Sequence, residues 1–83
     1  MTSRILYKSS VRHDLKKIAR GDQERILRQI EATLARNPRR GDQLHGDFEG
    51  LFKLRVGDYR IMYALVGQDV LVLRIRHRSK AYA

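Results

Sequence analysis

Residues 51–65 read LFKLRVGDYRIMYAL, and this stretch decides the fold. From its second residue on, apolar and basic side chains alternate, which is the pattern of a strand with one buried face. The glycine–aspartate pair at 57–58 then interrupts the pattern, and glycine in the first central position suits a two-residue type II′ turn. A second alternating run follows at once. The stretch therefore predicts a β-hairpin that sets Arg55 directly opposite Arg60.

A third alternating run, VLVLRIR at 70–76, predicts a third strand. A two-residue turn at 67–68 would place Arg60 on the apolar face of this strand, whereas a three-residue loop at 67–69 keeps it on the basic face. Burial of one face fixes the register strongly, so we expect the three-residue loop. The inward set of the third strand is then Leu71, Leu73 and Ile75, and the outward set is Val72, Arg74 and Arg76.

This register predicts which side chains meet across the sheet. The expected pairs are Phe52 with Tyr63, Ile61 with Ile75, Tyr63 with Leu73, Arg60 with Arg76, and Met62 with Arg74. The outward face then collects five cations and no acid, because the nearby aspartates at 58 and 69 lie in turns. The five cations are Lys53, Arg55, Arg60, Arg74 and Arg76.

The first half of the chain predicts a strand and a helical hairpin. Residues 3–8 read as a short strand, and the serines at 9–10 offer caps for a helix that Gly21 ends. Asp22 can cap a second helix, which closes before Pro38. Apolar residues recur at spacings of three and four in both segments, and the buried stripes are Val11, Leu15 and Ile18, then Ile26, Ile30 and Leu34.

Together these elements predict one α+β domain over residues 1–83. An N-terminal strand and a two-helix hairpin pack on a curved antiparallel sheet in the order β-α-α-β-β-β, with a loop at 37–50 between the two halves. A core of this size is marginal, and the chain has no cysteine. Its three histidines lack ligand-like spacing, so we expect no metal and no cofactor. A partner protein is the natural remaining support.

The charge balance favours an anionic partner. Lysine and arginine number 18 against 9 acidic residues, which gives a formal net charge of +9. Such a charge attracts nucleic acid, acidic proteins or membrane surfaces. The N-terminal residues contain no apolar run of the length that a signal peptide or membrane span needs, so we expect a cytoplasmic protein without a membrane partner.

The basic face allows two interpretations. A solvated sheet face also carries lysine and arginine, but it ordinarily mixes signs, because like charges directly opposite each other are destabilising. A concentrated set of guanidinium groups instead suits RNA phosphates and the extra charge of a phosphorane transition state. Arginine is a poor base, whereas a lysine surrounded by cations, as Lys53 is, can give up its proton.

The tail RHRSKAYA adds two candidates with open alternatives. Tyr82 suits either stacking on a nucleic-acid base or packing on its own domain. His77 titrates near neutrality and could exchange a proton, but a lone histidine between arginines is also an ordinary surface group. We treat His13 and His45 as structural or exposed.

The chain resembles the RelE/ParE superfamily of toxins from type II toxin–antitoxin modules, and its motifs are closer to the RelE branch. The resemblance covers nearly the whole chain, and it is carried by Gly-x-x-x-x-Leu-x-Lys-x-Arg, Tyr-Arg-Ile-Met-Tyr and the closing IRHRSKAY. It implies a ribosome-dependent endoribonuclease that cuts mRNA in the ribosomal A site, by attack of a 2′-hydroxyl on the adjacent phosphate.

The resemblance also implies roles for single residues. Lys53 matches a basic phosphate-binding residue, and Arg60 an arginine that stabilises the transition state. Arg76 matches an arginine proposed to protonate the leaving group, and Tyr82 a tyrosine that stacks on an mRNA base. Arg55 departs from the pattern, since the best-known RelE-type enzyme has a lysine there that is proposed as the general base.

The departure at Arg55 leaves the base open between Lys53 and His77, because some relatives use a C-terminal histidine. Two alternatives need no general base: the enzyme relies on electrostatic stabilisation alone, or its activity is weak. Arg74 and Arg78 are expected as further RNA contacts.

The resemblance implies a partner as well, a cognate antitoxin that is acidic, partly disordered when free, and wrapped around the toxin in a hetero-oligomer. Two other functions stay open. One is a ParE-like toxin that poisons DNA gyrase, and the other is a nucleic-acid-binding module without catalytic activity.

Overall fold

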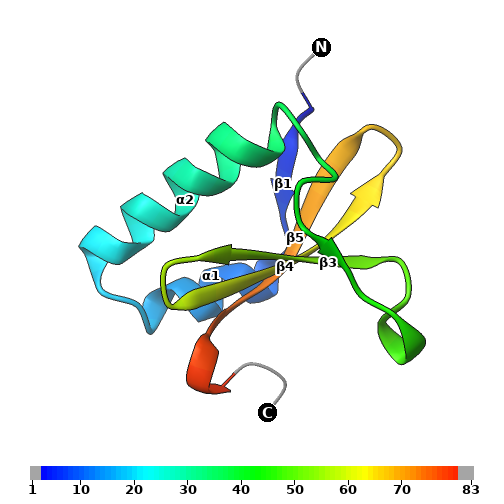
Figure 1. The fold of residues 1–83 in the computed structure, drawn as a ribbon. Coiled ribbons are helices and arrows are strands. Elements are labelled where there is room, and N and C mark those ends of the chain that lie inside the picture. Colours follow the sequence, from blue (N-terminus) through cyan, green and yellow to red (C-terminus); the bar gives the residue numbers. More distant parts are fainter. Residues whose placement is uncertain (1–2, 81–83) are drawn as a thin grey trace.

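The computed structural model describes residues 3–80 and has a layer of two helices against a five-stranded sheet (Figure 1). Two short 3-10 helices, η1 and η2, lie outside these layers. The elements run in the order β1 (Ile5–Tyr7), α1 (Ser9–Lys16), α2 (Arg20–Leu34), β2 (Asp42–Gln43), η1 (Gly46–Phe48), β3 (Leu51–Val56), β4 (Tyr59–Val66), β5 (Asp69–His77) and η2 (Arg78–Lys80). The predicted α+β class and element order are confirmed, with the two-residue strand β2 added inside the segment expected as a loop.

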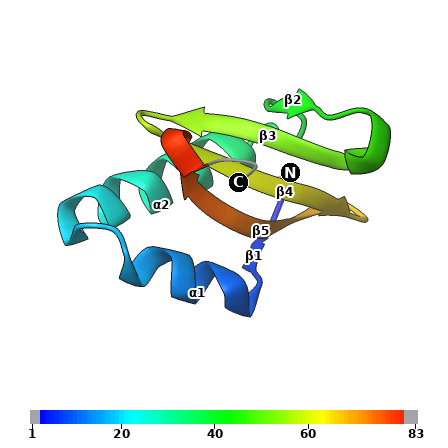
Figure 2. The same ribbon diagram turned by 90° about the horizontal axis from the view of Figure 1, so that it is seen from below.

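Within residues 3–80, neither α-helix covers one of the two faces of the sheet. Its strand order is β1-β5-β4-β3-β2; β1 runs parallel to β5, and the other neighbours are antiparallel. Both helices lie on the same side of the sheet (Figure 2). The core lies between the two layers, and the opposite sheet face, here called the open face, carries the outward side chains.

The first hairpin has the predicted register. Arg55 lies opposite Arg60, and the turn glycine Gly57 has a φ of 58°, as a primed two-residue turn requires. Phe52 and Tyr63 face each other and stack with ring centroids 5.3 Å apart. Their stacking fixes the inward face of β3 and β4, so the basic side chains of both strands point to the open face.

The second hairpin differs from the predicted one. Val66 pairs with Asp69, so the turn has two residues, and Tyr63 pairs with Val72 rather than Leu73. A β-bulge then shifts the register by one residue opposite the step from Met62 to Tyr63. Beyond the bulge the predicted pairs are confirmed: Met62 with Arg74, Ile61 with Ile75, and Arg60 with Arg76. The extra residue that we assigned to the turn is taken up inside β5.

The bulge also corrects the inward set of β5. Val70 and Val72 are fully buried, and Ile75 is buried beyond the bulge, whereas Leu71 and Leu73 are only partly buried. The prediction of Leu71 and Leu73 as inward residues, with Val72 outward, is therefore wrong. A strict alternation over the whole strand cannot describe a strand that changes phase in its middle.

The helices keep their predicted buried stripes but not their predicted ends. Ser9 is the first residue of α1 and Lys8 is its N-cap, while Ala19 is the N-cap of α2. Gly21 lies in the first turn of α2 instead of ending α1, and Asp22 follows it there without capping the helix. Among the predicted stripe residues, Leu15 is only partly buried, and the others are buried.

The segment that leads into β2 lies close against β3. The Gly41 N–H donates to the Tyr63 hydroxyl at 3.0 Å, and β2 then places Asp42 opposite Lys53. A Cβ at Gly41 would lie 2.6 Å from the Lys53 carbonyl oxygen and 2.7 Å from the Tyr63 hydroxyl. Only glycine fits this approach without a backbone shift.

We predict that Gly41→Ala lowers the free energy of unfolding by about 1–3 kcal/mol, the usual cost of overpacking. Gly21→Ala is the matched control, because a Cβ there meets nothing within 4 Å, and it should be neutral or stabilising by about 0.5–1 kcal/mol. Urea unfolding followed by circular dichroism measures both. Equal stability of the two variants would contradict the close approach at Gly41.

Candidate functional site

Three arginines lie side by side on the open face of the sheet. Arg55 on β3 pairs with Arg60 on β4, and Arg60 pairs with Arg76 on β5. We call Arg55, Arg60 and Arg76 the arginine row. Arg55 is exposed, and the other two are partly exposed. Directly opposed residues have Cβ atoms about 5 Å apart, so three long cationic side chains share one small surface.

Two local features align the row. The two-residue turn at 57–58 fixes the pair of Arg55 and Arg60, and the bulge in β5 fixes the pair of Arg60 and Arg76. Neither pair is favourable by itself, because like charges directly opposite each other destabilise a sheet. An anion that bridges neighbouring guanidinium groups would relieve this repulsion, and phosphate suits their fork of donors.

Lys53 lies one step along β3 from the row, on the same face. It is partly buried and pairs with Met62 on one side and with Asp42 of β2 on the other. The predicted face of five cations without an acid is therefore wrong, since an exposed carboxylate lies across the ladder from the lysine. The two-residue strand that carries this aspartate is too short to show a period in the sequence.

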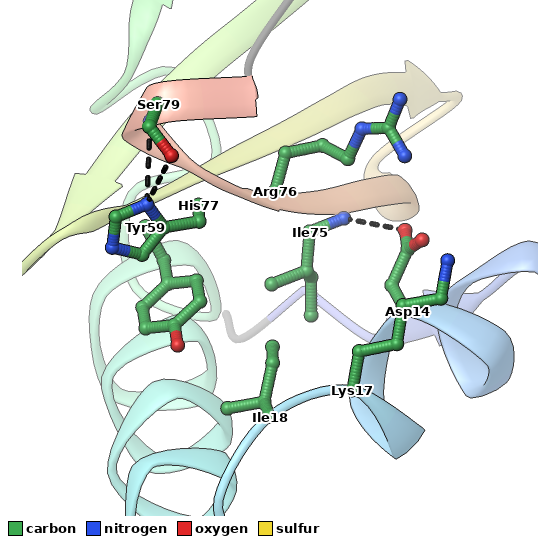
Figure 3. A pocket seen from close by; sticks show the side chains of 8 residues that line it. All are labelled: Asp14, Lys17, Ile18, Tyr59, Ile75, Arg76, His77 and Ser79. Carbon is green, nitrogen blue, oxygen red and sulfur yellow. Dashed lines mark hydrogen bonds between the residues drawn. The ribbon is translucent and has the colours of Figure 1, made fainter.

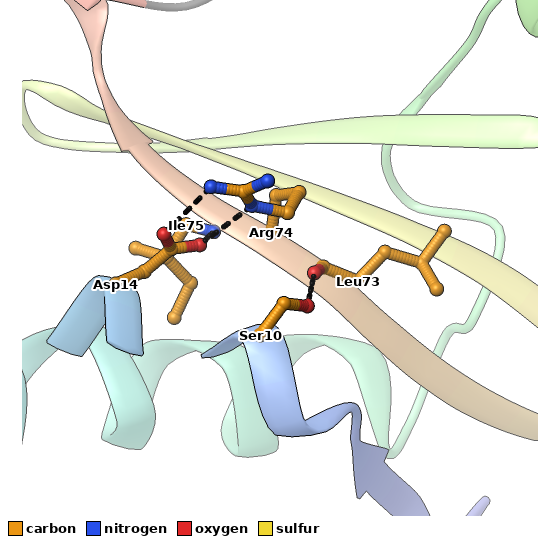
Figure 4. A network of polar contacts seen from close by, with 5 residues as sticks. All are labelled: Ser10, Asp14, Leu73, Arg74 and Ile75. Atoms are coloured by element: carbon orange, nitrogen blue, oxygen red, sulfur yellow. Dashed lines mark hydrogen bonds and ion pairs between the residues drawn. The ribbon is translucent and has the colours of Figure 1, made fainter. Parts of the chain in front are cut away.

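Arg74 pairs with Met62 on the open face, but its guanidinium group is bound by a carboxylate of the helical layer. Its Nε and Nη2 donate to the two carboxylate oxygens of Asp14 on α1, both at 2.9 Å (Figure 4). The Asp14 side chain is only 4% exposed, and its Oδ2 also accepts the backbone N–H of Ile75 at 2.9 Å. The sequence analysis named Arg74 as an RNA contact without this acid, and the RNA contact stays a prediction. Its signal in the sequence is a carboxylate at position 14, on the apolar stripe between Val11 and Ile18.

The surroundings of Asp14 keep it charged. Burial by itself would raise its pKa, but the hydrogen bonds from Arg74 and the Ile75 amide outweigh burial, and the charges of Arg74 and Arg76 act in the same direction. The net result is a pKa below the usual value. The same contact with Asp14 raises the pKa of Arg74. The pair is thus a charged clamp between α1 and β5.

His77 lies on the other face of the sheet from the arginine row. It pairs with Tyr59, whose ring packs against the core, and the two rings meet edge to face with centroids 5.3 Å apart. Its Nδ1 accepts the Ser79 backbone N–H at 3.3 Å and lies 2.9 Å from the Ser79 hydroxyl oxygen. Because Nδ1 accepts a hydrogen bond in this geometry, we assign the tautomer that has its proton on Nε2. The fold therefore does not bring His77 to the row.

A cavity opens beside the end of β5, between that strand and α1 (Figure 3). Its lining includes Ile18, Tyr59, Ile75, Arg76 and His77. In the close-up, the Arg76 side chain points away from the two rings. Arg76 thus lines this cavity and also belongs to the arginine row.

Of the two expected tail contacts, the structure describes Arg78. The Arg78 Nε lies 3.9 Å from an Asp58 oxygen, and Arg78 belongs to η2 rather than to the sheet. Tyr82 lies outside the described residues. Residues 3–80 contain no group of three or more His, Asp or Glu side chains that could hold a metal ion. Within the same residues, neither helix has the length and apolarity of a membrane span.

Comparisons with known proteins agree with this fold. Residues 5–82 match the family model described as "ParE toxin of type II toxin-antitoxin system, parDE". The chain is similar to a chain of the toxin–antitoxin complex RelBE2 from Mycobacterium tuberculosis, at 26% identity and a TM-score of 0.88, covering 96% of this chain and 95% of that one. Comparison with the curated proteins gave no significant match.

Two further solved structures represent both branches. A chain of the archaeal RelE-RelB complex from Pyrococcus horikoshii is 25% identical, with a TM-score of 0.68 over 96% of this chain and 99% of that one. A chain of the chromosomal ParDE TA system from P. aeruginosa is 16% identical, with a TM-score of 0.75 over 92% of this chain and 96% of that one. The latter likeness shows the fold alone.

The clamp makes a prediction about acid stability. The pKa of Asp14 is lower in the folded chain than the usual value of about 3.9. Its contribution to the free energy of unfolding is therefore fully present above that value, and it is lost as pH falls through the pKa of the folded state. At neutral pH, Asp14→Asn should lower the free energy of unfolding by about 2 kcal/mol, the scale of a hydrogen bond to a charged group. The difference from the unmodified chain should shrink below about pH 4. Denaturant unfolding at several pH values measures it, and parallel pH curves would contradict the clamp.

Proposed function

The chain belongs to the ParE toxin family of type II toxin–antitoxin systems, and on this premise we propose that it is an endoribonuclease that cleaves mRNA on the ribosome. The observation that carries the proposal is the alignment of Arg55, Arg60 and Arg76 across three strands on the open face. The likeness to a RelBE2 chain, at 26% identity and nearly complete coverage, supports the RelE-like activity.

The arginine row suits the chemistry of RNA cleavage. The 2′-oxygen attacks the adjacent phosphorus, the bond from phosphorus to the 5′-oxygen breaks, and a 2′,3′-cyclic phosphate and a 5′-hydroxyl result. The phosphorane between these steps carries more negative charge than the starting phosphodiester. Arg60 lies at the centre of the row, where a guanidinium can stabilise that charge, and Arg76 lies on one side of it.

The proton transfers need a second kind of group. Arg55 lies at the position where the RelE-type enzyme has its proposed general base, but a guanidinium does not give up its proton in proteins. Lys53 lies on the same face of β3, two residues from Arg55, and we assign its neutral form to accept the 2′-proton, since the neighbouring Arg55 charge favours that form and the Asp42 charge across the ladder opposes it. Arg76 stays assigned to the leaving 5′-oxygen, where its guanidinium donates a hydrogen bond and stabilises the developing charge, and water supplies the proton that completes the 5′-hydroxyl. We leave His77 out of the mechanism, because it lies on the other face of the sheet. Base stacking by Tyr82 stays a prediction of the resemblance.

We also propose that a cognate antitoxin covers the arginine row. The chain has a formal net charge of +9, and its small core gains stability from any partner that binds only the folded form. An acidic segment that is disordered when free could lay carboxylates over the guanidinium groups as it folds. The RelBE2 structure is a toxin–antitoxin complex, and the archaeal structure is a complex of RelE with RelB.

The match to a family model named after ParE favours a second function, the inhibition of DNA gyrase. A gyrase inhibitor has no need to align three arginines for cleavage. A module that binds nucleic acid without cutting it is the third possibility. Mapping of mRNA ends after expression in cells separates the three: codon-phased cuts support the nuclease, DNA damage without cuts supports the gyrase inhibitor, and neither supports the third.

We predict that Arg60→Ala and Arg76→Ala each lower the cleavage rate on the order of 100- to 1,000-fold, the cost of removing one donor to the developing charge. Both variants should stay folded, because the two side chains lie on the open face outside the core. Arg28→Ala, on the exposed surface of α2, is the matched control and should cleave at the unmodified rate.

Single-turnover cleavage of mRNA in the A site of purified ribosomes measures these rates, and circular dichroism checks the fold. Full activity of both row variants would overturn the assignment of the site. An equal loss of activity in the Arg28 control would show a general effect of charge.

A further inference from the structure

The bulge in β5 decides on which face Arg76 lies. On the turn side of the bulge, Tyr63 pairs with Val72, and on the far side Arg60 pairs with Arg76. If the first register continued, Arg76 would pair with Tyr59, whose ring packs against the core. Ile75 would then take the place opposite Arg60. One extra residue in β5 therefore moves Arg76 from the helix-covered face to the arginine row.

Helix α1 holds the backbone of β5 at this bulge. The Ser10 hydroxyl donates to the Leu73 carbonyl oxygen at 2.7 Å, and the Ile75 N–H donates to the Asp14 carboxylate at 2.9 Å (Figure 4). Ser10 and Asp14 are four residues apart, so they lie on one face of the helix. Arg74, the residue between the two anchored positions, donates twice to the same carboxylate.

The edge of β5 changes its bonding partner from β1 to α1 at the same place where the bulge shifts its register by one residue. The residues on either side of β1 bond to β5: the Val70 N–H donates to the Arg4 carbonyl, and the Lys8 N–H donates to the Val72 carbonyl. The next groups on that edge, the Leu73 carbonyl and the Ile75 N–H, bond to α1. The backbone groups of β5 that bond toward β1 belong to residues 70 and 72, whereas those that bond to α1 belong to residues 73 and 75. The helix takes the place of the strand where the backbone slips by one residue.

We propose that Asp14 is a positioning residue for the reaction proposed above, because its grip on Arg74 and the Ile75 amide keeps the bulge in place and Arg76 opposite Arg60. The proposal rests on the proposed function for its catalytic consequence, but the placement of Arg76 can be measured without any RNA. Asp14 suits this task because a carboxylate can accept all three hydrogen bonds at once, and the Arg74 charge offsets the cost of burying it.

The variants separate positioning from stability. Asp14→Ala removes every anchor that the side chain gives, whereas Asp14→Asn keeps one oxygen for the Ile75 N–H and gives up the double contact with Arg74. Asp22→Asn is the matched control, because Asp22 pairs with Arg25 at 2.9 Å on the exposed surface of α2, away from the bulge.

The first readout is NMR on the full chain without RNA. Cross-strand NOEs report whether Arg60 still faces Arg76, and hydrogen exchange reports whether the Ile75 amide stays protected. We expect Asp14→Ala to lose the NOEs and the protection, Asp14→Asn to keep part of both, and Asp22→Asn to keep them fully. Unchanged NOEs and protection in a folded Asp14→Ala chain would overturn the proposal.

The second readout is the cleavage rate of ribosome-bound mRNA, with KM and kcat measured separately. Misplacement of a catalytic group by about 1 Å costs on the order of 100-fold, and we expect a fall of that order in kcat for Asp14→Ala, with a smaller fall for Asp14→Asn and little change in KM. A kcat equal to that of Asp22→Asn would contradict the positioning role. If the unmodified chain cuts no RNA, the proposed function fails, and the NMR result still decides the placement of Arg76.

Discussion

The hydrogen bond from the Ile75 backbone to the Asp14 carboxylate is the interaction on which the arrangement of the open face depends. It lies where β5 loses its neighbour β1 and changes phase, and it joins the helical layer to the sheet at that point. Val72 and Ile75 both face the core because of this change, although they are three residues apart. Without it, one end of β5 would turn its apolar side chains to solvent and its arginines to the core.

The hairpin of β3 and β4 could be predicted from the sequence because every signal there agrees. The alternation is strict, the glycine suits the turn, and Phe52 and Tyr63 mark the inward face. Two of the three arginine positions in the row follow from this hairpin alone. The third, Arg76, came out correctly although the loop at 67–69 was wrong, because the bulge adds the residue that the shorter turn leaves over.

The errors about the cations of the open face arise because no local pattern in the sequence shows which residues pair with them. Nothing near position 74 shows that Arg74 meets a carboxylate 60 residues earlier, and the only hint is an acid on an apolar helical stripe. Asp42 reaches Lys53 through a strand of two residues, too short for any period. No residue type in β5 marks the position of the bulge. Charge counts along a strand therefore overstated the cations on the open face.

An arginine row is costly for a small domain, since like charges face each other twice across the same sheet. The basic residues of the open face fall into two groups with different surroundings. Arg74 binds Asp14 of the helical layer, and Arg55, Arg60 and Arg76 lie in one row on the open face. The same repulsion would give the acidic antitoxin that we propose a source of binding energy, because covering the row would relieve it.

The structure of the chain on a ribosome whose A-site mRNA has a 2′-deoxy nucleotide at the cleavage position tests the account most directly. Without the 2′-hydroxyl the attack cannot occur, so the complex should stay intact for cryo-electron microscopy. The account predicts that the phosphate at that position lies against Arg60 and Arg76 on the open face of the sheet. A phosphate bound to the helical layer, or an mRNA that does not touch the arginine row, would contradict it.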